Sequence, residues 1–328
     1  MEKRNLFQEA LQTRKHLVLD GAFATELERF GCNLKDPLWS AKALIEAPHL
    51  VKKVHLSYLA VGADIVESSG YQATVEGFES KGFSTEEAKE LVKLSVSTAI
   101  DARNTFIAAK KAGATIVEGF PIQENNALSY PLVAASVGPF GAFLADGSEY
   151  RGAYGKTIDE LAHFHRSRLA LFAAVEPDVF ACETIPCLDE AKALAIVLSE
   201  GEVTKGIPSW VSFSCQDEEH ICSGESIGDC AAYLDTVEAV QAIGINCTQP
   251  KYVESLIHHI REHTAKPIVV YPNTGELYNI KARAWYGEVE AFDTFARTWA
   301  KAGASIIGGC CRIGPAHIES LASWMHEV

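Results

Sequence analysis

The sequence has no apolar run long enough to cross a membrane, and it has few basic residues. A membrane-spanning helix needs about 20 consecutive apolar residues, and neither such a run nor the apolar core of a secretory signal follows the charged N-terminal segment MEKRNLFQEALQTRKH. Lysine and arginine number 29 against 43 aspartates and glutamates, for a net charge of -14. Proteins that bind nucleic acid gather basic side chains against the phosphates. We therefore expect no membrane partner, no nucleic-acid partner and a cytoplasmic location.

The sequence also lacks a C-x-x-C motif among its nine cysteines. This absence argues against a structural zinc ribbon and against a thioredoxin-like dithiol. An odd number of cysteines in a chain without a secretory signal argues against a disulfide framework. Free cysteine is most often a small buried apolar residue, and we expect that role for Cys32, Cys182, Cys187, Cys215, Cys222 and Cys230.

What the sequence does contain is a repeated alternation of short Val- and Ile-rich runs with longer amphipathic segments. Hydrophobic residues make up 48% of the chain and charged residues 22%, which is enough apolar material for a large core. Such alternation is typical of repeated βα units. The runs expected to be strands are HLVLDG (16–21), DIVESS (64–69), LVAASVG (132–138), DVFACET (178–184), SWVSFSC (209–215), VQAIGINC (240–247), PIVVYPN (267–273) and SIIGGCC (305–311).

The segments between these runs carry helix start and stop signals. Ser84 and Glu87 have the spacing of a capping box ahead of an apolar stripe. Pro250 and Pro315 are placed where a first helical turn begins. Glycines in the similar contexts VGADIV, AGATIV and AGASII are expected to end helices in the left-handed conformation, namely Gly62, Gly113 and Gly303.

Eight such strands alternating with helices predict one closed (β/α)8 barrel domain over residues 1–328. An open doubly wound sheet is the alternative, because the same alternation fits it. The run ATIVEGF (114–120) is a ninth strand candidate, one more than a barrel needs, and a polar, proline-flanked stretch follows it. We therefore predict an inserted loop at about 113–131.

Active sites of such barrels form at the carboxyl ends of the strands. Cys247 ends the sixth run, and Cys310 and Cys311 end the eighth, so three thiols should face one another across the rim. Soft thiolates select zinc, and three protein ligands with a fourth position open are typical of a catalytic zinc site. Three buried core cysteines are the other interpretation of this spacing. Gly308 and Gly309 favour the first interpretation, because paired glycines indicate close backbone approach at a strand end.

The sequence resembles the homocysteine S-methyltransferases, zinc enzymes that methylate homocysteine to methionine. The resemblance runs through nearly the whole chain, in the segments LVLDGAFATELE, DPLWSAKALIEAP, SSGYQATVEGF, SVGPFGAFLADGSEYRG, CETIP, GINCTQP, YPNTGE and IIGGCCRIGP. It implies the barrel fold and a Zn2+ ion with Cys247, Cys310 and Cys311 as ligands. The segment SVGPFGAFLADGSEYRG is similar to the group that uses S-methylmethionine, with S-adenosylmethionine as a second donor, rather than betaine. Thr184 replaces the tyrosine of the betaine group, so no fourth protein ligand is expected.

The resemblance also implies roles for the polar strand ends. Asp20 and Glu183 should bind the ammonium group of homocysteine, although a strand-end carboxylate can also cap the next helix. From their strand-end positions alone, the amides around Gly21 and Ala22 are expected to hold its carboxylate, and Asn246 is expected to orient the loop that carries Cys247. Glu67 and Asn273 are expected to line the donor side. A sulfonium cation attracts aromatic faces, so Phe23, Trp39, Tyr71 and Trp285 are candidates for donor contact, with simple packing as the other interpretation.

Other functions fit the sequence less well. A barrel metal-hydrolase needs histidine and carboxylate ligands around an activated water, whereas these strand ends carry thiols. The histidines of HFH (163–165) and HH (258–259) are expected on solvated faces of outer helices. A methyltransferase that uses betaine or another donor is the main alternative. A non-catalytic zinc-stabilised binding protein is a further one, and it should unfold when the metal is removed.

Overall fold

Eight parallel strands form one sheet that closes into a barrel. The computed structural model describes residues 4–32, 39–123, 127–275, 277–279, 284–286 and 291–326. The strand order is β1-β10-β7-β6-β5-β4-β3-β2. Their bounds are β1 Leu17–Val18, β2 Ile65–Glu67, β3 Leu132–Val137, β4 Val179–Ile185, β5 Ser209–Phe213, β6 Val240–Asn246, β7 Ile268–Tyr271 and β10 Ala304–Ile307.

The first and second strands complete the closure. Leu19 and Ile65 form a parallel bridge. The Asp20 amide donates to the Ile65 carbonyl at 3.1 Å, and the Asp64 amide donates to the Val18 carbonyl at 2.8 Å. The predicted (β/α)8 barrel is therefore confirmed, and the open-sheet alternative is wrong because no free edge separates these two strands.

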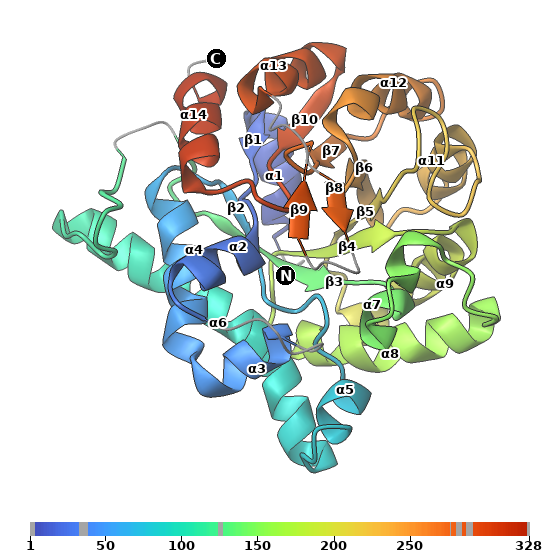
Figure 1. Ribbon diagram of the computed structural model, residues 1–328, viewed down its shortest axis with the longest axis horizontal. Coiled ribbons are helices and arrows are strands. Elements are labelled where there is room, and N and C mark those ends of the chain that lie inside the picture. The colour runs from blue at the N-terminus through green and yellow to red at the C-terminus, as the bar shows by residue number, and fades with distance from the viewer. Residues whose placement is uncertain are drawn as a thin grey trace.

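Helices surround the strands, as Figure 1 shows for α4, α6, α8, α9, α11, α12, α13 and α14. The predicted capping box of Ser84 and Glu87 begins α6, and a second one, Thr157 with Glu160, begins α8. The helix bounds are α1 Leu6–Thr13, α2 Phe23–Arg29, α3 Trp39–Glu46, α4 Pro48–Ala60, α5 Val75–Glu79, α6 Thr85–Ala112, α7 Phe140–Leu144, η1 Ser148–Tyr150, α8 Ile158–Ala174, α9 Leu188–Leu198, α10 Gly201–Thr204, α11 Ile227–Asp235, α12 Pro250–Arg261, α13 Phe292–Ala302 and α14 Pro315–Met325.

The other helix signals are also confirmed. Pro250 and Pro315 occupy the first turn of α12 and α14. Gly113 and Gly303 end their helices with φ angles of 64° and 117°, in the left-handed region that glycine adopts without a Cβ penalty. Within the described chain, no helix combines the length and the hydrophobicity needed to cross a membrane.

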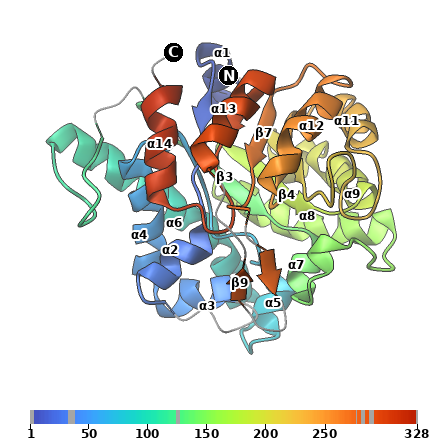
Figure 2. The same cartoon turned by 45° about the horizontal axis from the view of Figure 1, so that its top comes forward.

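The barrel interior is filled, and α1 covers one end of it. Phe7 and Ala10 of α1 pack with interior strand side chains that include Leu17, Leu19 and Trp210. The rings of Phe7 and Trp210 lie 5.8 Å apart. In Figure 2, α1 lies at one end of the strands and β9 at the other. Because α1 covers one end, a catalytic site can form only at the other end, where the strands have their carboxyl ends.

Two parts of the chain between the strands differ from a plain barrel. An antiparallel hairpin of β8 (Leu277–Asn279) and β9 (Ala284–Tyr286) follows β7, and the sequence patterns did not predict it. Its strands are too short for a periodic signal. In the segment expected to be a loop at about 113–131, the described residues contain one isolated bridge, Val117 with Phe120, and no barrel strand.

A buried ion pair connects α6 to the sheet and generates a stability prediction. Arg103 Nη1 lies 2.7 Å from Asp178 Oδ2, with side chains 7% and 10% exposed, and the same oxygen accepts the Val133 amide at 2.8 Å. Arg103→Met leaves the carboxylate buried with its countercharge removed, so it should lower the free energy of unfolding by about 3 kcal/mol. Lys89→Met removes an exposed ion pair on the same helix and should cost less than about 1 kcal/mol. Urea unfolding measures both, and equal losses would contradict the prediction.

Candidate active site

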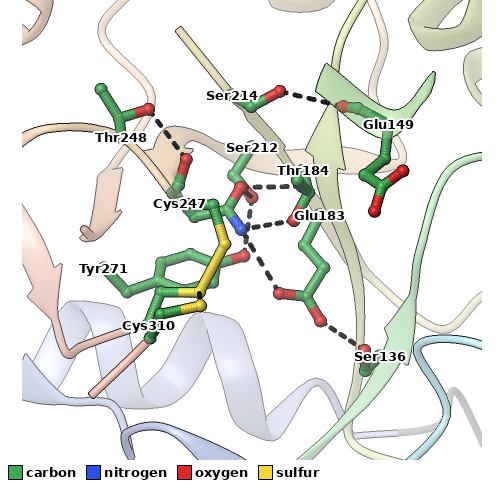
Figure 3. Close-up of a disulfide and its surroundings, with 12 residues drawn as sticks. Ser136, Glu149, Glu183, Thr184, Ser212, Ser214, Cys247, Thr248, Tyr271 and Cys310 are labelled. Atoms are coloured by element: carbon green, nitrogen blue, oxygen red, sulfur yellow. Dashed lines mark hydrogen bonds between the residues drawn. A yellow bond between two sulfur atoms is a disulfide. The ribbon is translucent and has the colours of Figure 1, made fainter. Parts of the chain in front are cut away.

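Three cysteine sulfurs lie together at the carboxyl end of the barrel. The Sγ atoms of Cys247, Cys310 and Cys311 are all within 4.8 Å of one another, the one such group among the described residues. Figure 3 shows Cys247 and Cys310 directed at the same point, where their sulfurs are joined as a disulfide, and Cys311 keeps a free thiol. Once that disulfide is reduced, the three sulfurs become soft donors that converge on one point, which matches a tetrahedral thiolate metal site with one open position.

Backbone contacts fix this cluster to the strands. The Cys247 amide donates to the Tyr271 carbonyl at 3.3 Å, and the Cys310 amide donates to the Pro272 carbonyl at 2.8 Å. A Cβ at Gly308 would lie 2.7 Å from the Asp20 carbonyl oxygen, so only glycine allows this approach. The close backbone approach expected at the strand end is therefore present, and it joins the cysteine loop to the end of β1.

Three carboxyl groups lie in the same mouth, at the ends of β1, β2 and β4. Asp20 and Glu183 are buried, and Asp20 Oδ2 accepts the Glu67 amide at 3.1 Å. Asp20 Oδ1 and Glu67 Oε1 are buried and have no hydrogen-bond partner among the described residues. Burial, and then the charge of Glu183, raises the pKa of Asp20 well above its usual range, and the pKa of Glu67 rises for the same reasons. Such a pocket favours a bound cation.

Glu183 is the carboxyl group with a defined set of partners. The Ser136 hydroxyl donates to its Oε1, and Asn246 Nδ2 lies 3.5 Å from its Oε2. Burial raises the pKa of Glu183 to about 7, and the bond from Ser136 offsets part of that rise. Ser136 was not among the expected site residues, although a serine in the otherwise apolar run LVAASVG is a signal of a polar function on the inner face.

Asn246 organises the strand ends beside Cys247. Its Oδ1 accepts the Thr184 amide at 2.7 Å and the Ser212 hydroxyl at 2.9 Å, and its Nδ2 donates to Thr184 Oγ1 at 2.7 Å. Ser212 Oγ and the Tyr271 hydroxyl are 2.6 Å apart. The Asn246 side chain therefore cross-links β4 and β5, and Ser212 extends the network to β7, one residue before Cys247. Ser212 and Tyr271 were also missed, because nothing in the sequence shows that they face Asn246.

The remaining residues expected in the site occupy varied positions. The Ala22 amide donates to the Ile313 carbonyl at 2.8 Å, which leaves the Gly21 amide as the remaining candidate of that pair. Phe23 begins α2, with its ring 5.4 Å from that of His55. Asn273 Oδ1 is buried without a hydrogen-bond partner in the described part of the chain. Trp39 and Trp285 belong to α3 and β9, and their side chains lie outside the described residues.

A buried cation fixes the loops that follow β2 and β3. The Arg168 guanidinium donates to the Gly138 carbonyl and, at 3.4 Å, to the Tyr71 carbonyl. It also lies 3.0 Å from His165 Nδ1, while His165 Nε2 lies 2.9 Å from Glu190 Oε1. Burial lowers the pKa of Arg168 to about 10, so it stays charged at neutral pH. His165 was expected on a solvated face and is instead fully buried, because this network faces the sheet.

The other cysteines are mostly core residues, as expected. Cys182, Cys187, Cys215 and Cys230 are buried, whereas Cys32 and Cys222 are partly exposed. Burial raises the pKa of Cys182 to about 12, which makes its thiol unreactive at neutral pH.

Comparison with known proteins agrees with this geometry. Homocysteine S-methyltransferase YbgG of Bacillus subtilis (strain 168) is 47% identical over 327 residues and covers 99% of each chain. Selenocysteine Se-methyltransferase of Brassica oleracea var. italica is 46% identical, covering 94% of this chain and 89% of its own. The metallated form of the homocysteine methyltransferase MmuM from Escherichia coli superposes with a TM-score of 0.82 at 38% identity, covering 97% of this chain and 99% of its own.

The family pattern described as homocysteine S-methyltransferase matches residues 17–325. That match spans the barrel from β1 to α14 and includes the three clustered cysteines and the three carboxyl groups of the mouth. The chain belongs to the homocysteine S-methyltransferase family.

Proposed function

We propose that this enzyme holds a zinc ion with Cys247, Cys310 and Cys311 and methylates homocysteine from S-methylmethionine, with S-adenosylmethionine as a second donor. The observation that carries the proposal is the convergence of three sulfurs within 4.8 Å beside a buried carboxyl pocket. Homocysteine has a thiol that such a metal site binds and an ammonium group that pairs with the buried carboxyl groups. Its methylation gives methionine. A relative of 38% identity with a metallated form supports metal binding by this barrel.

The chemistry of the donor set supports zinc over harder metals. Thiolates are soft ligands and favour zinc, whereas magnesium and calcium take oxygen ligands. When bound, zinc supplies the reactive form of the acceptor, because a coordinating thiol is deprotonated outright. The cysteines bind a metal only as free thiolates, so the Cys247–Cys310 disulfide must be reduced before the metal binds. We therefore propose that the enzyme works in a reducing compartment, the cytoplasm.

The buried carboxyl groups position the acceptor. Asp20 and Glu183 bind the homocysteine ammonium, which satisfies the unpartnered Asp20 Oδ1. The Gly21 amide is available to the homocysteine carboxylate. Asn246 holds Thr184 and thereby the end of β4, so that Glu183 keeps its orientation. These contacts hold the acceptor in one geometry at the metal site.

The methyl transfer itself needs no protein acid or base. The acceptor thiolate sulfur forms a bond to the methyl carbon, the carbon–sulfur bond of the sulfonium breaks, and its electron pair stays on the donor sulfur. A thiolate and a sulfonium become two neutral thioethers, so charge disappears and a water-excluded pocket favours the transition state. The protein therefore contributes to catalysis through the strand-end side chains, which exclude water and align the two sulfurs.

The donor assignment is tested by supplying the zinc-loaded enzyme with homocysteine and, in separate reactions, S-methylmethionine, S-adenosylmethionine or betaine. Methionine should form from both sulfonium donors, because each carries a cationic sulfur as leaving group. Liquid chromatography measures the methionine. Methionine formed from betaine alone would refute the assignment of the donor. No methionine from any of the three donors would refute the proposed function.

The metal assignment is tested with Cys310→Ser. The variant should fall from about one zinc ion per chain to none and lose activity while it stays folded, because two thiolates do not complete a zinc site. Zinc analysis, methionine formation and circular dichroism measure the three effects. Cys222→Ser, a partly exposed cysteine outside the cluster, is the matched control and should keep both zinc and activity. An active, zinc-loaded Cys310→Ser would contradict the assignment, and unfolding on zinc removal would favour a zinc-stabilised binding protein.

The acceptor contacts are tested with Glu183→Gln. Loss of the carboxylate should raise the KM for homocysteine about 30-fold, equivalent to about 2 kcal/mol. Because the pKa of Glu183 is raised to about 7, the binding-competent carboxylate is present above this pH and lost below it. The wild-type KM should therefore rise as the pH falls below about 7, and Glu183→Gln should lack this component. Exposed Glu202→Gln serves as control, and an unchanged KM in Glu183→Gln would contradict the role.

A further inference from the structure

We propose that Glu149, with Tyr71 and Tyr150, forms a subsite for the α-ammonium and sulfonium groups of the methyl donor, so that the enzyme selects sulfonium donors that are also amino acids. The inference rests on the proposed function, because it assigns the donor side of the same site.

The turn that carries Glu149 is built onto the mouth of the barrel. It belongs to η1, between α7 and α8. A Cβ at Gly141 of α7 would lie 2.3 Å from the Glu149 amide nitrogen, so α7 and the turn are packed backbone to backbone. The Ser214 hydroxyl, just past β5, lies 3.5 Å from the Glu149 carbonyl oxygen, as drawn in Figure 3. The turn is therefore held over the ends of β4 and β5.

One oxygen of the Glu149 carboxylate, Oε2, is buried and has no hydrogen-bond partner among the residues that the structure describes. Burial is the largest cause that raises the pKa of Glu149. Hydrogen bonds from the backbone amides of Glu149 and Gly147, and the charge of the exposed Arg151 side chain, oppose this rise only in part. A buried carboxylate oxygen of this kind is stabilised by a cation that also donates a hydrogen bond. An ammonium group does both.

The homocysteine ammonium is accounted for elsewhere, by Asp20 and Glu183 on the inner strand ends. In Figure 3, Glu149 lies on the side of Thr184 and Glu183 away from Cys247 and Cys310. In S-methylmethionine a short carbon chain separates the ammonium from the reacting sulfonium, so a donor with its sulfur near the thiols needs its ammonium site displaced from them. Glu149 has that position.

Tyr150 follows Glu149 in η1, and Tyr71 lies in the loop after β2. Burial first, and then the charges of Cys311 and Glu149, raise the pKa of Tyr150. Tyr150 nevertheless exposes 45% of its surface, which identifies it as a wall of the open mouth and not a core residue. The pKa of Tyr71 is likewise raised by burial, Tyr150 and Glu149. Aromatic faces attract a sulfonium cation.

The walls of this subsite are rigid on the Tyr71 side. The buried Arg168 guanidinium donates to the carbonyls of Tyr71 and Gly138, so the loops after β2 and β3 keep a fixed spacing. Betaine carries a quaternary nitrogen without N–H groups, and it would leave Glu149 Oε2 without a donor. A site that requires such a hydrogen bond discriminates against analogues that lack it.

Glu149→Gln tests the subsite, because it keeps the size of the side chain and removes its charge. We expect kcat/KM for S-methylmethionine to fall roughly 30-fold, with the KM for homocysteine and the zinc content unchanged. The desamino analogue of S-methylmethionine, used as a competitive inhibitor, should bind Glu149→Gln and wild type equally. Steady-state kinetics and inhibition constants measure these effects.

Asp146→Asn is the matched control on the same turn. Asp146 is exposed, and its Oδ1 accepts the Ser148 amide at 2.9 Å, so this variant perturbs the turn but leaves the Glu149 charge in place. It should keep the wild-type kcat/KM for S-methylmethionine. The subsite would be overturned if both variants lost the same kcat/KM, or if Glu149→Gln kept the wild-type kcat/KM. It would also be overturned if Glu149→Gln bound the desamino analogue more weakly than wild type by the same factor as its loss of kcat/KM for S-methylmethionine. Failure of wild type to use S-methylmethionine would instead refute the proposed donor.

Discussion

The pairing of β1 with β10 on one side and with β2 on the other is the interaction on which the site depends. The Leu19 amide donates to the Ile307 carbonyl at 2.9 Å, and the Asp20 amide donates to the Ile65 carbonyl at 3.1 Å. These bonds close the barrel and bring Asp20, Glu67 and the loop of Cys310 to one place. The Gly309 amide then donates to the Asp20 carbonyl at 3.0 Å, so the carboxyl group proposed to bind the acceptor and the thiols share one backbone framework.

The same framework concentrates negative charge. Three sulfurs and three carboxyl groups line one mouth, and buried oxygens of Asp20 and Glu67 have no hydrogen-bond partner in the described part of the chain. Burial raises the pKa values of Asp20 and Glu67. Their carboxyl groups are therefore protonated more readily, which lowers the electrostatic repulsion in the empty site. A cationic metal, the ammonium groups of the two substrates and the donor sulfonium would neutralise what remains. An anionic pocket of this kind fits a reaction in which a sulfonium loses its charge.

The sequence predicted the barrel and the convergence of the thiols because both follow from local patterns. Strand ends in a parallel barrel share one rim, so Cys247, Cys310 and Cys311 could be brought together without coordinates. The β8–β9 hairpin, the burial of His165 and the position of Glu149 could not be predicted, because each depends on how distant segments pack. A glutamate in the turn LADGSEYRG has no periodic or spacing signal, and only the contact of that turn with Ser214 places it over the mouth.

The proposed acceptor and donor sites rest on different kinds of structure. The groups proposed to bind the acceptor are strand ends, fixed by the hydrogen bonds of a closed sheet, and a displacement there would also disturb the cysteine loop through Asp20 and Gly309. The groups proposed to bind the donor lie on connections, with Glu149 and Tyr150 on a turn and Tyr71 on a loop held by Arg168. Connections accept substitution and insertion more readily than strand ends. One barrel can thus keep the thiol chemistry constant while its connections determine which methyl donor reaches the acceptor.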